Sequence, residues 1–329
     1  MLGVLALLAL GARPPTAYEA AIAGLEQRAR DTTPTAAELA DLALACDRLW
    51  ALDANRLTPG ADYELDLQGR ARAWESGVDH ARRPLFKWVR EGAIAGPTWA
   101  AFGRLLDNYD RSVGVDEVVT REKLRQDAAF LDAILRTPCV EYARKYLKAK
   151  GLARARDAAR FKELLFEKWL RVYSRSRGHL DSSGFEHVFL GEEKDGKVTG
   201  LHNWLRMYLE EKAGRLNYLG HFAPRAAAAK SGGGRARDAG LAPESRQLVT
   251  VQFAWGAEVK SVSSSLVGTS PEFEIALYTL CFLAGEHENV VRCGPYDVLV
   301  TCFTQRGRIG ANRGKTFIGS SFPGVPRPG

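Results

Sequence analysis

The first half of the chain repeats apolar and polar residues with the period of an α-helix. Between Ala17 and Phe166 it is rich in Ala, Leu, Arg and Glu, and apolar residues recur three and four positions apart. Examples are Leu39, Leu42, Ala43 and Cys46, and later Phe130, Ile134 and Leu135. This period predicts amphipathic helices over residues 16–165, whose apolar stripes serve as core.

Local signals mark some ends of these helices. Thr35 followed by Glu38 has the spacing of a capping box, in which the two side chains satisfy free backbone N–H groups at a helix start. Pro97 and Thr98 precede another helical run. Gly151 and the basic stretch after it predict the end of one helix and the start of the next.

The second half of the chain changes to the period of β-strands. Three segments are rich in Val, Thr and aromatic residues, namely residues 248–255, 296–304 and 315–322. One helix, from Pro271 to Gly285, interrupts them, and the preceding Gly268–Ser270 turn supplies its cap. Helices followed by strands predict an α+β fold, with a helical N-terminal region and a mixed, mainly antiparallel sheet region.

Composition places the chain among globular proteins that have a basic surface. It has 329 residues, of which 46% are hydrophobic, and a formal net charge of +7. The pI near 9.2 favours a polyanionic partner, because Lys and Arg that neutralise phosphates release counterions. Between Pro224 and Pro243 an alanine tract, three glycines and several basic residues show no apolar period, which predicts a flexible surface insertion over 224–243.

The N-terminus and the cysteines give opposite indications of compartment. An apolar run from Leu2 to Leu10 within residues 1–15 has the length of a secretory signal, although no basic residue precedes it, and an apolar helix start is the alternative. The run is too short to span a membrane. Five scattered cysteines form no CxxC pair, and their odd number favours a reducing compartment. We expect secretion, with a cytoplasmic or nuclear location as the alternative.

The most informative segment, residues 183–204, reads SGFEHVFLGEEKDGKVTGLHNW. It holds two of the six histidines, His187 and His202, on either side of a polar turn. This arrangement predicts a hairpin-like unit with His187 at a strand end and the two rings side by side. Histidine gives and takes protons near neutral pH, so the pair suggests transesterification of a phosphodiester. A lone histidine would more often be structural.

Metal binding is a competing interpretation of the same segment. Glutamate and two histidines can ligate zinc, but no HExxH pattern is present and fifteen residues is not the spacing of one helix face. Zinc therefore ranks below proton transfer. Glu186 or Glu192 could instead hold a hard cation such as Mn²⁺, Mg²⁺ or Ca²⁺.

A third component is Lys260, which follows a strand and a turn and precedes a run of serines. A cation there could stabilise the charge that develops on a phosphorane. An exposed lysine with no such role is the alternative, and the spacing does not choose between them.

These segments together resemble the EndoU (XendoU) family of uridylate-specific endoribonucleases, from about Ala36 to Pro323. The motifs that carry the resemblance are RPLFKWV (83–89), LLDNY (105–109), SGFEHVFLGE (183–192), GLHNW (200–204), FAWGAEVK (253–260), GTSPEFEIALYTLCFL (268–283) and IGSSFP (318–323). The resemblance implies that residues 16–165 form the helical part and residues 166–323 the catalytic part of one such domain, with 324–329 as a tail.

The resemblance implies cleavage of single-stranded RNA at uridylates with 2′,3′-cyclic phosphate ends, and a catalytic trio of His187, His202 and Lys260. Elementary chemistry agrees, because the attacking 2′-OH must lose a proton and the leaving 5′-oxygen must gain one. We assign His202 as general base, His187 as general acid and Lys260 as electrostatic stabiliser. An RNA-binding protein that has kept the fold but cleaves weakly, and a regulatory domain with a protein partner, are the alternatives.

Further residues enter through the resemblance alone. Ser264, Thr269 and Phe322 are the implied substrate-binding residues, with Phe322 stacking on the base and Ser264 hydrogen-bonding to it. Many members of the family have Tyr where Phe322 stands. Phe keeps the stacking face and lacks the hydroxyl, so this departure bears on the preference for uridine more than on cleavage. Glu186 and Glu192 match acidic positions that support the site.

The cofactor and partners are expectations of the same kind. The resemblance implies a requirement for Mn²⁺, with Ca²⁺ or Mg²⁺ as alternatives and Glu186 and Glu192 as candidate ligands. A cyclic product needs no activated water, so the metal need not generate a nucleophile. We expect single-stranded, uridine-containing RNA as the partner of a monomer, with no membrane and no obligate protein partner.

Overall fold

The computed structural model describes residues 31–72, 74–107, 109–176, 178–222 and 247–326. Residues Thr32–Gly329 form one compact unit. The apolar N-terminal run, and the predicted insertion at 224–243, lie outside the described residues. Among the described residues, no helix is long and apolar enough to cross a membrane.

Helices dominate the N-terminal half, as the periodicity predicts. They are α2 (Ala36–Ala40), α3 (Leu42–Leu52), α4 (Pro97–Gly103), α5 (Arg121–Ile134), α6 (Pro138–Ala149) and α7 (Ala158–Leu165), with short 3-10 turns at Glu91–Ile94 and Ala153–Ala155 and a wide helical turn at Phe166–Leu170. The capping box is confirmed, since the Glu38 N–H donates to Thr35 Oγ1 and the Thr35 N–H to Glu38 Oε2. Two short antiparallel strands, β1 (Tyr63–Leu65) and β2 (Phe86–Val89), interrupt the helices, which the sequence did not predict.

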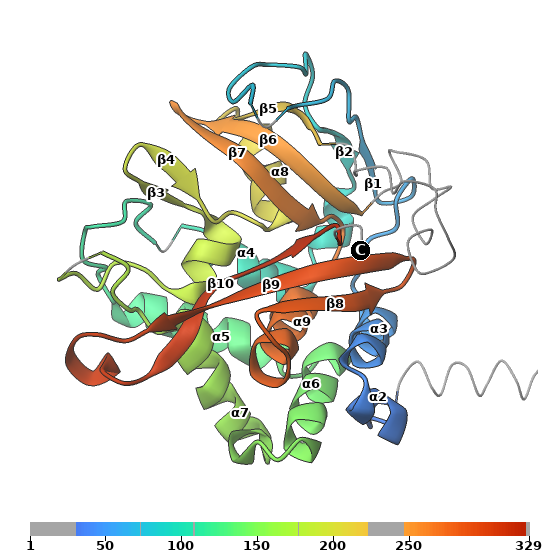
Figure 1. Cartoon of the computed structure of the whole chain (residues 1–329), viewed down its shortest axis with the longest axis vertical. Coiled ribbons are helices and arrows are strands. Elements are labelled where there is room, and N and C mark those ends of the chain that lie inside the picture. The colour runs from blue at the N-terminus through green and yellow to red at the C-terminus, as the bar shows by residue number, and fades with distance from the viewer. Residues whose placement is uncertain (1–30, 73, 108, 177, 223–246, 327–329) are drawn as a thin grey trace, which may run out of the picture. The chain divides into compact units, whose positions relative to one another are not determined.

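The C-terminal half carries two antiparallel three-stranded sheets. One has the order β5 (Leu216–His221), β6 (Leu248–Trp255), β7 (Glu258–Leu266), and the other β10 (Thr316–Gly324), β9 (Tyr296–Arg306), β8 (Glu288–Cys293). A 3-10 turn at Gly310–Asn312 lies in the β9–β10 connection. The predicted strands at 248–255, 296–304 and 315–322 are all present, and the α+β fold is confirmed (Figure 1). The sequence missed β5, β7 and β8.

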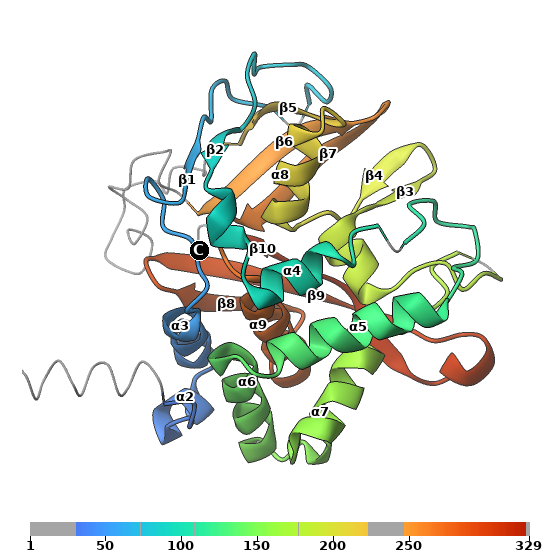
Figure 2. The same ribbon diagram turned by 180° about the vertical axis from the view of Figure 1, so that it is seen from behind.

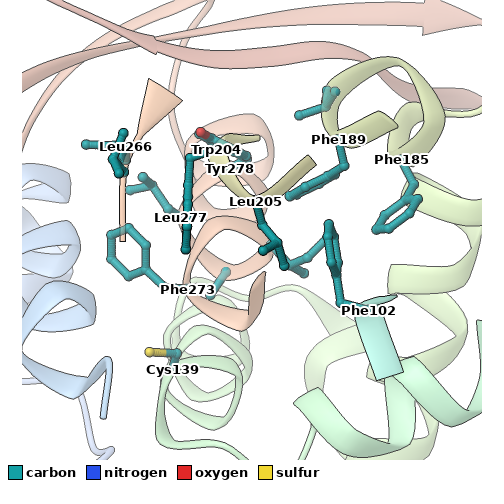
Figure 3. Packing of buried hydrophobic residues seen from close by; sticks show 14 of the residues in the cluster. Phe102, Cys139, Phe185, Phe189, Trp204, Leu205, Leu266, Phe273, Leu277 and Tyr278 are labelled. Carbon is teal, nitrogen blue, oxygen red and sulfur yellow. The ribbon is translucent and has the colours of Figure 1, made fainter. Parts of the chain in front are cut away.

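Helix α9 (Pro271–Ala284) is the centre of the core. Ser270 caps it and Pro271 begins it, as the turn sequence predicts, and every residue from Pro271 to Cys281 is buried. In Figure 1 helices α4 and α5 lie behind the sheet of β8–β10, and in Figure 2 they face the viewer. Figure 3 shows Phe273, Leu277 and Tyr278 of this helix among rings and aliphatic side chains from other elements. A helix that is buried on all sides joins the helical half to the sheets.

The segment between the two halves folds differently from the sequence prediction. His187 was expected at a strand end, and this was wrong: Glu186–Leu190 is a wide helical turn that follows directly on residues 184–185. The hairpin itself is present as β3 (Glu192–Lys194) and β4 (Lys197–Thr199), whose turn uses positive φ at Asp195 and Gly196. The chain then enters α8 (Trp204–Lys212).

Two backbone hydrogen bonds tie the ends of this segment together. The Leu201 N–H donates to the His187 carbonyl at 3.0 Å, and the His202 N–H donates to the Val188 carbonyl at 2.7 Å. Gly200 makes this approach sterically feasible, because it has φ +65° and a Cβ there would lie 1.8 Å from the His187 oxygen. The two histidines are therefore neighbours through the main chain.

Gly200→Ala should destabilise the protein by two effects, the strain of a left-handed backbone conformation and the clash of the new Cβ with the His187 carbonyl. Gly214 is the matched control, since it has φ +70° and no atom lies within 4 Å of the place that a Cβ would take. Gly214→Ala should lower the free energy of unfolding by ~1–2 kcal/mol, the cost of a left-handed residue, and Gly200→Ala by clearly more. Urea denaturation checks this, and equal losses in the two variants would contradict the steric argument.

Candidate active site

A cavity of about 640 Å³ lies where the two histidine segments meet both sheets. His187 and His202 line it together with Lys260 and Ser264 of β7 and Phe322 of β10. The remaining lining residues are Arg175, Thr199, Gly200, Val262, Phe303, Thr304, Gln305, Gly319 and Ser320. Five side chains that the sequence analysis singled out, from segments far apart along the chain, thus share one cavity.

His187 is held by a buried carboxylate. Its Nδ1 lies 2.6 Å from Glu192 Oε2, and Glu192 is fully buried behind it. Because an ionised carboxylate only accepts, Nδ1 carries the proton and Nε2 is left without a partner among the described residues. Burial lowers the pKa of His187, the Arg175 charge lowers it further, and the Glu192 carboxylate opposes both.

Arg175 and Ser182 keep Glu192 in its ionised form. Arg175 Nε lies 3.3 Å from Glu192 Oε2, and the Ser182 hydroxyl donates to Glu192 Oε1. Burial alone would raise the pKa of Glu192, but His187 and Arg175 outweigh burial and bring that pKa below its ordinary value. Arg175 is itself fixed by hydrogen bonds to the Tyr173 hydroxyl and the Gly319 carbonyl, each at 2.6 Å.

His202 has a different environment. Its Nδ1 lies 3.3 Å from the Ser264 carbonyl and 3.4 Å from Ser263 Oγ, and no carboxylate contacts it within the described part of the chain. A carbonyl accepts only, so Nδ1 again donates and Nε2 keeps its lone pair. Burial lowers the pKa of His202 well below its ordinary value, and the positive charges of Lys260 and His187 act in the same direction. His202 is thus neutral at neutral pH.

Lys260 brings a positive charge to the same cavity from β7. It pairs with Phe253 across the sheet, next to an irregularity in the register between Val251 and Phe253. Burial lowers the pKa of Lys260 to about 8, against the opposing effect of Glu192. Below that pH the ammonium is charged, and no acidic residue of the described chain forms an ion pair with it. Its charge is therefore available to an anionic ligand.

Two histidines in different electrostatic environments and one lysine thus surround the same cavity. Comparison with known proteins identifies the family of the chain. The sequence model described as Endoribonuclease XendoU matches residues 41–323. This chain belongs to the XendoU family of endoribonucleases. The resemblance and the class of enzyme predicted from the sequence are confirmed.

Several relatives support the assignment. The chain is 44% identical over 250 residues to uridylate-specific endoribonuclease C of Danio rerio, covering 74% of this chain and 76% of that protein. It is 38% identical over 295 residues to poly(U)-specific endoribonuclease-B of Xenopus laevis, covering 87% and 94%. A solved structure of XendoU, described as a splicing independent snoRNA processing endoribonuclease, superposes with a TM-score of 0.70 at 38% identity, covering 87% of this chain and 97% of that one.

Two residues predicted for the XendoU-like site lie elsewhere. Thr269 is fully buried, donates to the Leu266 carbonyl at 2.7 Å and contacts Glu274, so its expected place at the substrate is wrong. Glu186 does not line the cavity either. Its carboxyl is buried, and burial raises its pKa well above the ordinary value, an effect to which the charges of Glu117 and Glu192 add. Neither carboxyl oxygen of Glu186 has a hydrogen-bond partner among the described residues, and its role in supporting the site stays a prediction.

The predicted metal ligands form no obvious binding set. Glu192 accepts hydrogen bonds from His187 and Ser182 and pairs with Arg175, whereas neither oxygen of the buried Glu186 has a hydrogen-bond partner among the described residues. No group of three or more His, Cys, Asp or Glu side chains suited to a metal occurs in the described part of the chain. Metal binding by these two glutamates stays a prediction, and no step of the chemistry below passes through a metal.

Sequence reasoning missed several residues of the cavity. Arg175, Phe303, Gln305 and Ser320 carry no recognisable spacing in the sequence, and they reach the cavity through the pairing of β9 with β10 or through the contact of Arg175 with Glu192. Phe303 is 47% exposed and its ring is nearly parallel to that of Phe322, with centroids 6.3 Å apart. An aromatic residue in the predicted strand 296–304 is the one sequence signal that could have indicated Phe303.

Glu192→Gln should lower the pKa of His187 further, because the amide removes the negative charge that favours the imidazolium. An NMR titration of the His187 ring measures this directly. Glu193→Gln is the matched control, since Glu193 is 40% exposed and pairs with Arg111 at 3.5 Å. An unchanged His187 pKa in Glu192→Gln would show that the carboxylate does not set its protonation.

Proposed function

We propose that this protein is a uridylate-specific endoribonuclease that cleaves single-stranded RNA by attack of the 2′-OH on the adjacent phosphorus. The observation that carries the proposal is the unequal pair of histidines beside Lys260 in one cavity. Relatives named for uridylate or poly(U) specificity, at 34–44% identity, support the choice of substrate.

The different partners of the two histidines support their proposed roles. His202, neutral and with Nε2 as an acceptor, takes the proton of the 2′-OH. His187, whose imidazolium is favoured by the Glu192 carboxylate, gives a proton from Nε2 to the leaving 5′-oxygen. The bound phosphate adds a negative charge that favours this imidazolium further. The P–O bond to the 2′-oxygen forms as the bond to the 5′-oxygen breaks, which gives a 2′,3′-cyclic phosphate and consumes no water.

Lys260 is the proposed stabiliser of the transition state. Its ammonium is partly withdrawn from water, where a charge acts more strongly on developing negative charge than at an exposed site. Arg175 lies on the same cavity and adds a second positive charge. Neither group needs to move a proton in this scheme.

The proposed uracil site is the β7 and β10 side of the cavity. Ser264 Oγ is hydrogen-bonded to Thr250 Oγ1 at 2.9 Å, which leaves it further hydrogen-bonding capacity toward a base. Phe322 is nearly parallel to His202, with centroids 4.7 Å apart, and to Phe303, with centroids 6.3 Å apart, so these rings form an aromatic wall of the cavity against which a base could pack. Stacking tolerates every base, so the choice of uracil rests on hydroxyls such as those of Ser264 and Ser320.

Manganese stimulation and secretion remain predictions for this chain. The proposed proton transfers need no metal-bound water, so we propose that Mn²⁺ acts on the RNA or on the shape of the site. The apolar N-terminus, on which the expectation of secretion rests, lies outside the described residues.

An RNA with a single uridine tests the function. The purified protein should cut it at the uridine in Mn²⁺, but not in EDTA, and leave a cyclic phosphate that mass spectrometry identifies. A substrate with 2′-deoxyuridine should resist cleavage while binding normally. His187→Ala and His202→Ala should each lower the rate by at least about 100-fold, the usual range for loss of a general acid or base, with RNA binding kept.

The outcomes separate the proposal from its alternatives. Cleavage of the 2′-deoxy substrate would rule out the cyclic-phosphate route. Binding without cleavage by the unaltered protein would favour the RNA-binding alternative. The same cut in EDTA would make the metal dispensable.

The pH dependence of cleavage should reflect the lowered pKa values of the site. The acid limb should lie below pH 6.5, because the pKa of His202 is depressed and the base stays unprotonated down to that pH. Two groups act on the alkaline limb: the general acid His187, whose pKa burial lowers, and Lys260, which loses its proton near pH 8, so the limb should lie no higher than about pH 8. In Lys260→Arg the alkaline limb should move upward, since a guanidinium stays charged. Single-turnover rates measure both limbs, and an unmoved alkaline limb would assign it to His187 instead.

A further inference from the structure

A second hollow continues from the candidate active site along the start of β7. Its volume is about 450 Å³, and it shares Lys260 and Val262 with the first cavity. Its other walls come from the β3–β4 turn, with Gly196 and Lys197, and from Ser76 in the connection between β1 and β2. A ligand in the first cavity can therefore extend into the second without leaving the surface.

The loop that supplies Ser76 is fastened to the sheet. Ser76 Oγ and Ser261 Oγ are 3.0 Å apart, and the Gly77 N–H donates to Gln252 Oε1 at 2.9 Å. Gln252 is fully buried and donates from Nε2 to the Ser261 carbonyl at 3.3 Å. This part of the loop is thus a fixed wall of the hollow.

Trp74 lies two residues before Ser76 in the same loop, outside the lining of both hollows, and 79% of its surface is exposed. Tryptophan is on average a highly buried residue, and an indole this exposed keeps a large apolar face in water. Arg72 lies beside it, with its guanidinium carbon 5.9 Å from the ring centroid. An exposed indole next to an arginine is a combination that stacks well on nucleic-acid bases.

Charge around the hollow is mixed. Lys197 and Lys260 are balanced in part by Glu258, whose carboxylate lies near Gly196, and Arg72 is paired with Glu75 at 3.1 Å. A site built for phosphates would carry a clear excess of positive charge. The chemistry of this surface therefore favours contact with a base over contact with the backbone.

We infer that this hollow is a subsite for nucleotides that flank the cleaved uridine, and that Trp74 is the platform on which one flanking base stacks. The inference rests on the proposed function, because it takes an RNA strand in the first cavity as its starting point. The site would favour single-stranded RNA, since only an unpaired base offers a free face to the indole.

The subsite is tested by comparing substrates of different length. Cleavage of uridine 3′-(methyl phosphate), which carries no flanking base, is compared with cleavage of single-uridine RNAs extended on the 5′ side, the 3′ side or both. Trp74→Ala should raise KM for at least one extended RNA about tenfold, within the range for loss of one stacked base, and leave kcat and the KM of the methyl ester unchanged. Trp74→Phe should restore most of the affinity because it keeps an aromatic face.

Trp88→Ala is the matched control. Trp88 is also an exposed tryptophan, at 39%, but it lies on β2, donates to Glu64 and does not belong to the loop that supplies Ser76 to the second hollow. This variant should bind every RNA as the unaltered protein does. The Trp74→Ala effect should also change little with salt, because a stacking contact releases few counterions.

Equilibrium binding separates failure of the subsite from failure of the proposed function. RNAs with 2′-deoxyuridine at the cleavage position are titrated by fluorescence anisotropy, so no cleavage is needed. Wild-type affinity of Trp74→Ala for every extended RNA would overturn the subsite, whatever the enzyme cleaves. Equal losses in KM for uridine 3′-(methyl phosphate) and the extended RNAs would also overturn it. Absence of cleavage with the Trp74-dependent affinity intact would overturn the enzyme proposal alone.

Discussion

The site depends on the two backbone hydrogen bonds that join the His187–Val188 carbonyls to the Leu201–His202 amides. They fix two segments that are separated by the β3–β4 hairpin, and they set the relation between the two imidazoles before any side-chain contact is made. Gly200 is the residue that permits the approach. Main-chain ties are geometrically stricter than side-chain packing, and small displacements of reacting groups are costly in catalysis. Both sheets then close around this fixed pair.

In this site, residues of the same type have different pKa values because their neighbouring groups differ. A carboxylate contacts one ring and a carbonyl the other, so His187 is the better imidazolium and His202 the better base, although both rings are buried. The same principle separates Glu192 from Glu186. The pKa of Glu192 is lowered because it has His187 and Arg175 as partners, whereas burial and then the charge of Glu117 raise the pKa of Glu186 well above its ordinary value. Different surroundings give residues of the same type different pKa values, and these differences indicate which residue acts as acid and which as base.

The core explains how distant segments reach one cavity. Helix α9 is buried on all sides, and its Glu274 accepts from Asn203 Nδ2 at 3.0 Å, beside His202. Asn203 also caps α8 by accepting from the Arg206 N–H. Burial raises the pKa of Glu274 to about 8, so it is a neutral hydrogen-bonding partner at the centre of the core. The packing that stabilises the fold thereby also positions one of the two proposed catalytic histidines.

The sequence by itself determined the fold class, several element boundaries, the family and five residues of the cavity, because periodicity, caps and contiguous motifs are local signals. It failed for β5, β7 and β8, whose residues do not show a clean alternation, and for the helical turn of His187, where five residues are too few to define a period. Only the tertiary structure decided that Thr269 and Glu186 do not line the cavity and that Arg175, Phe303 and Ser320 do. The physical reason is that side-chain direction and charge environment arise from contacts between residues far apart in sequence, which no local pattern records.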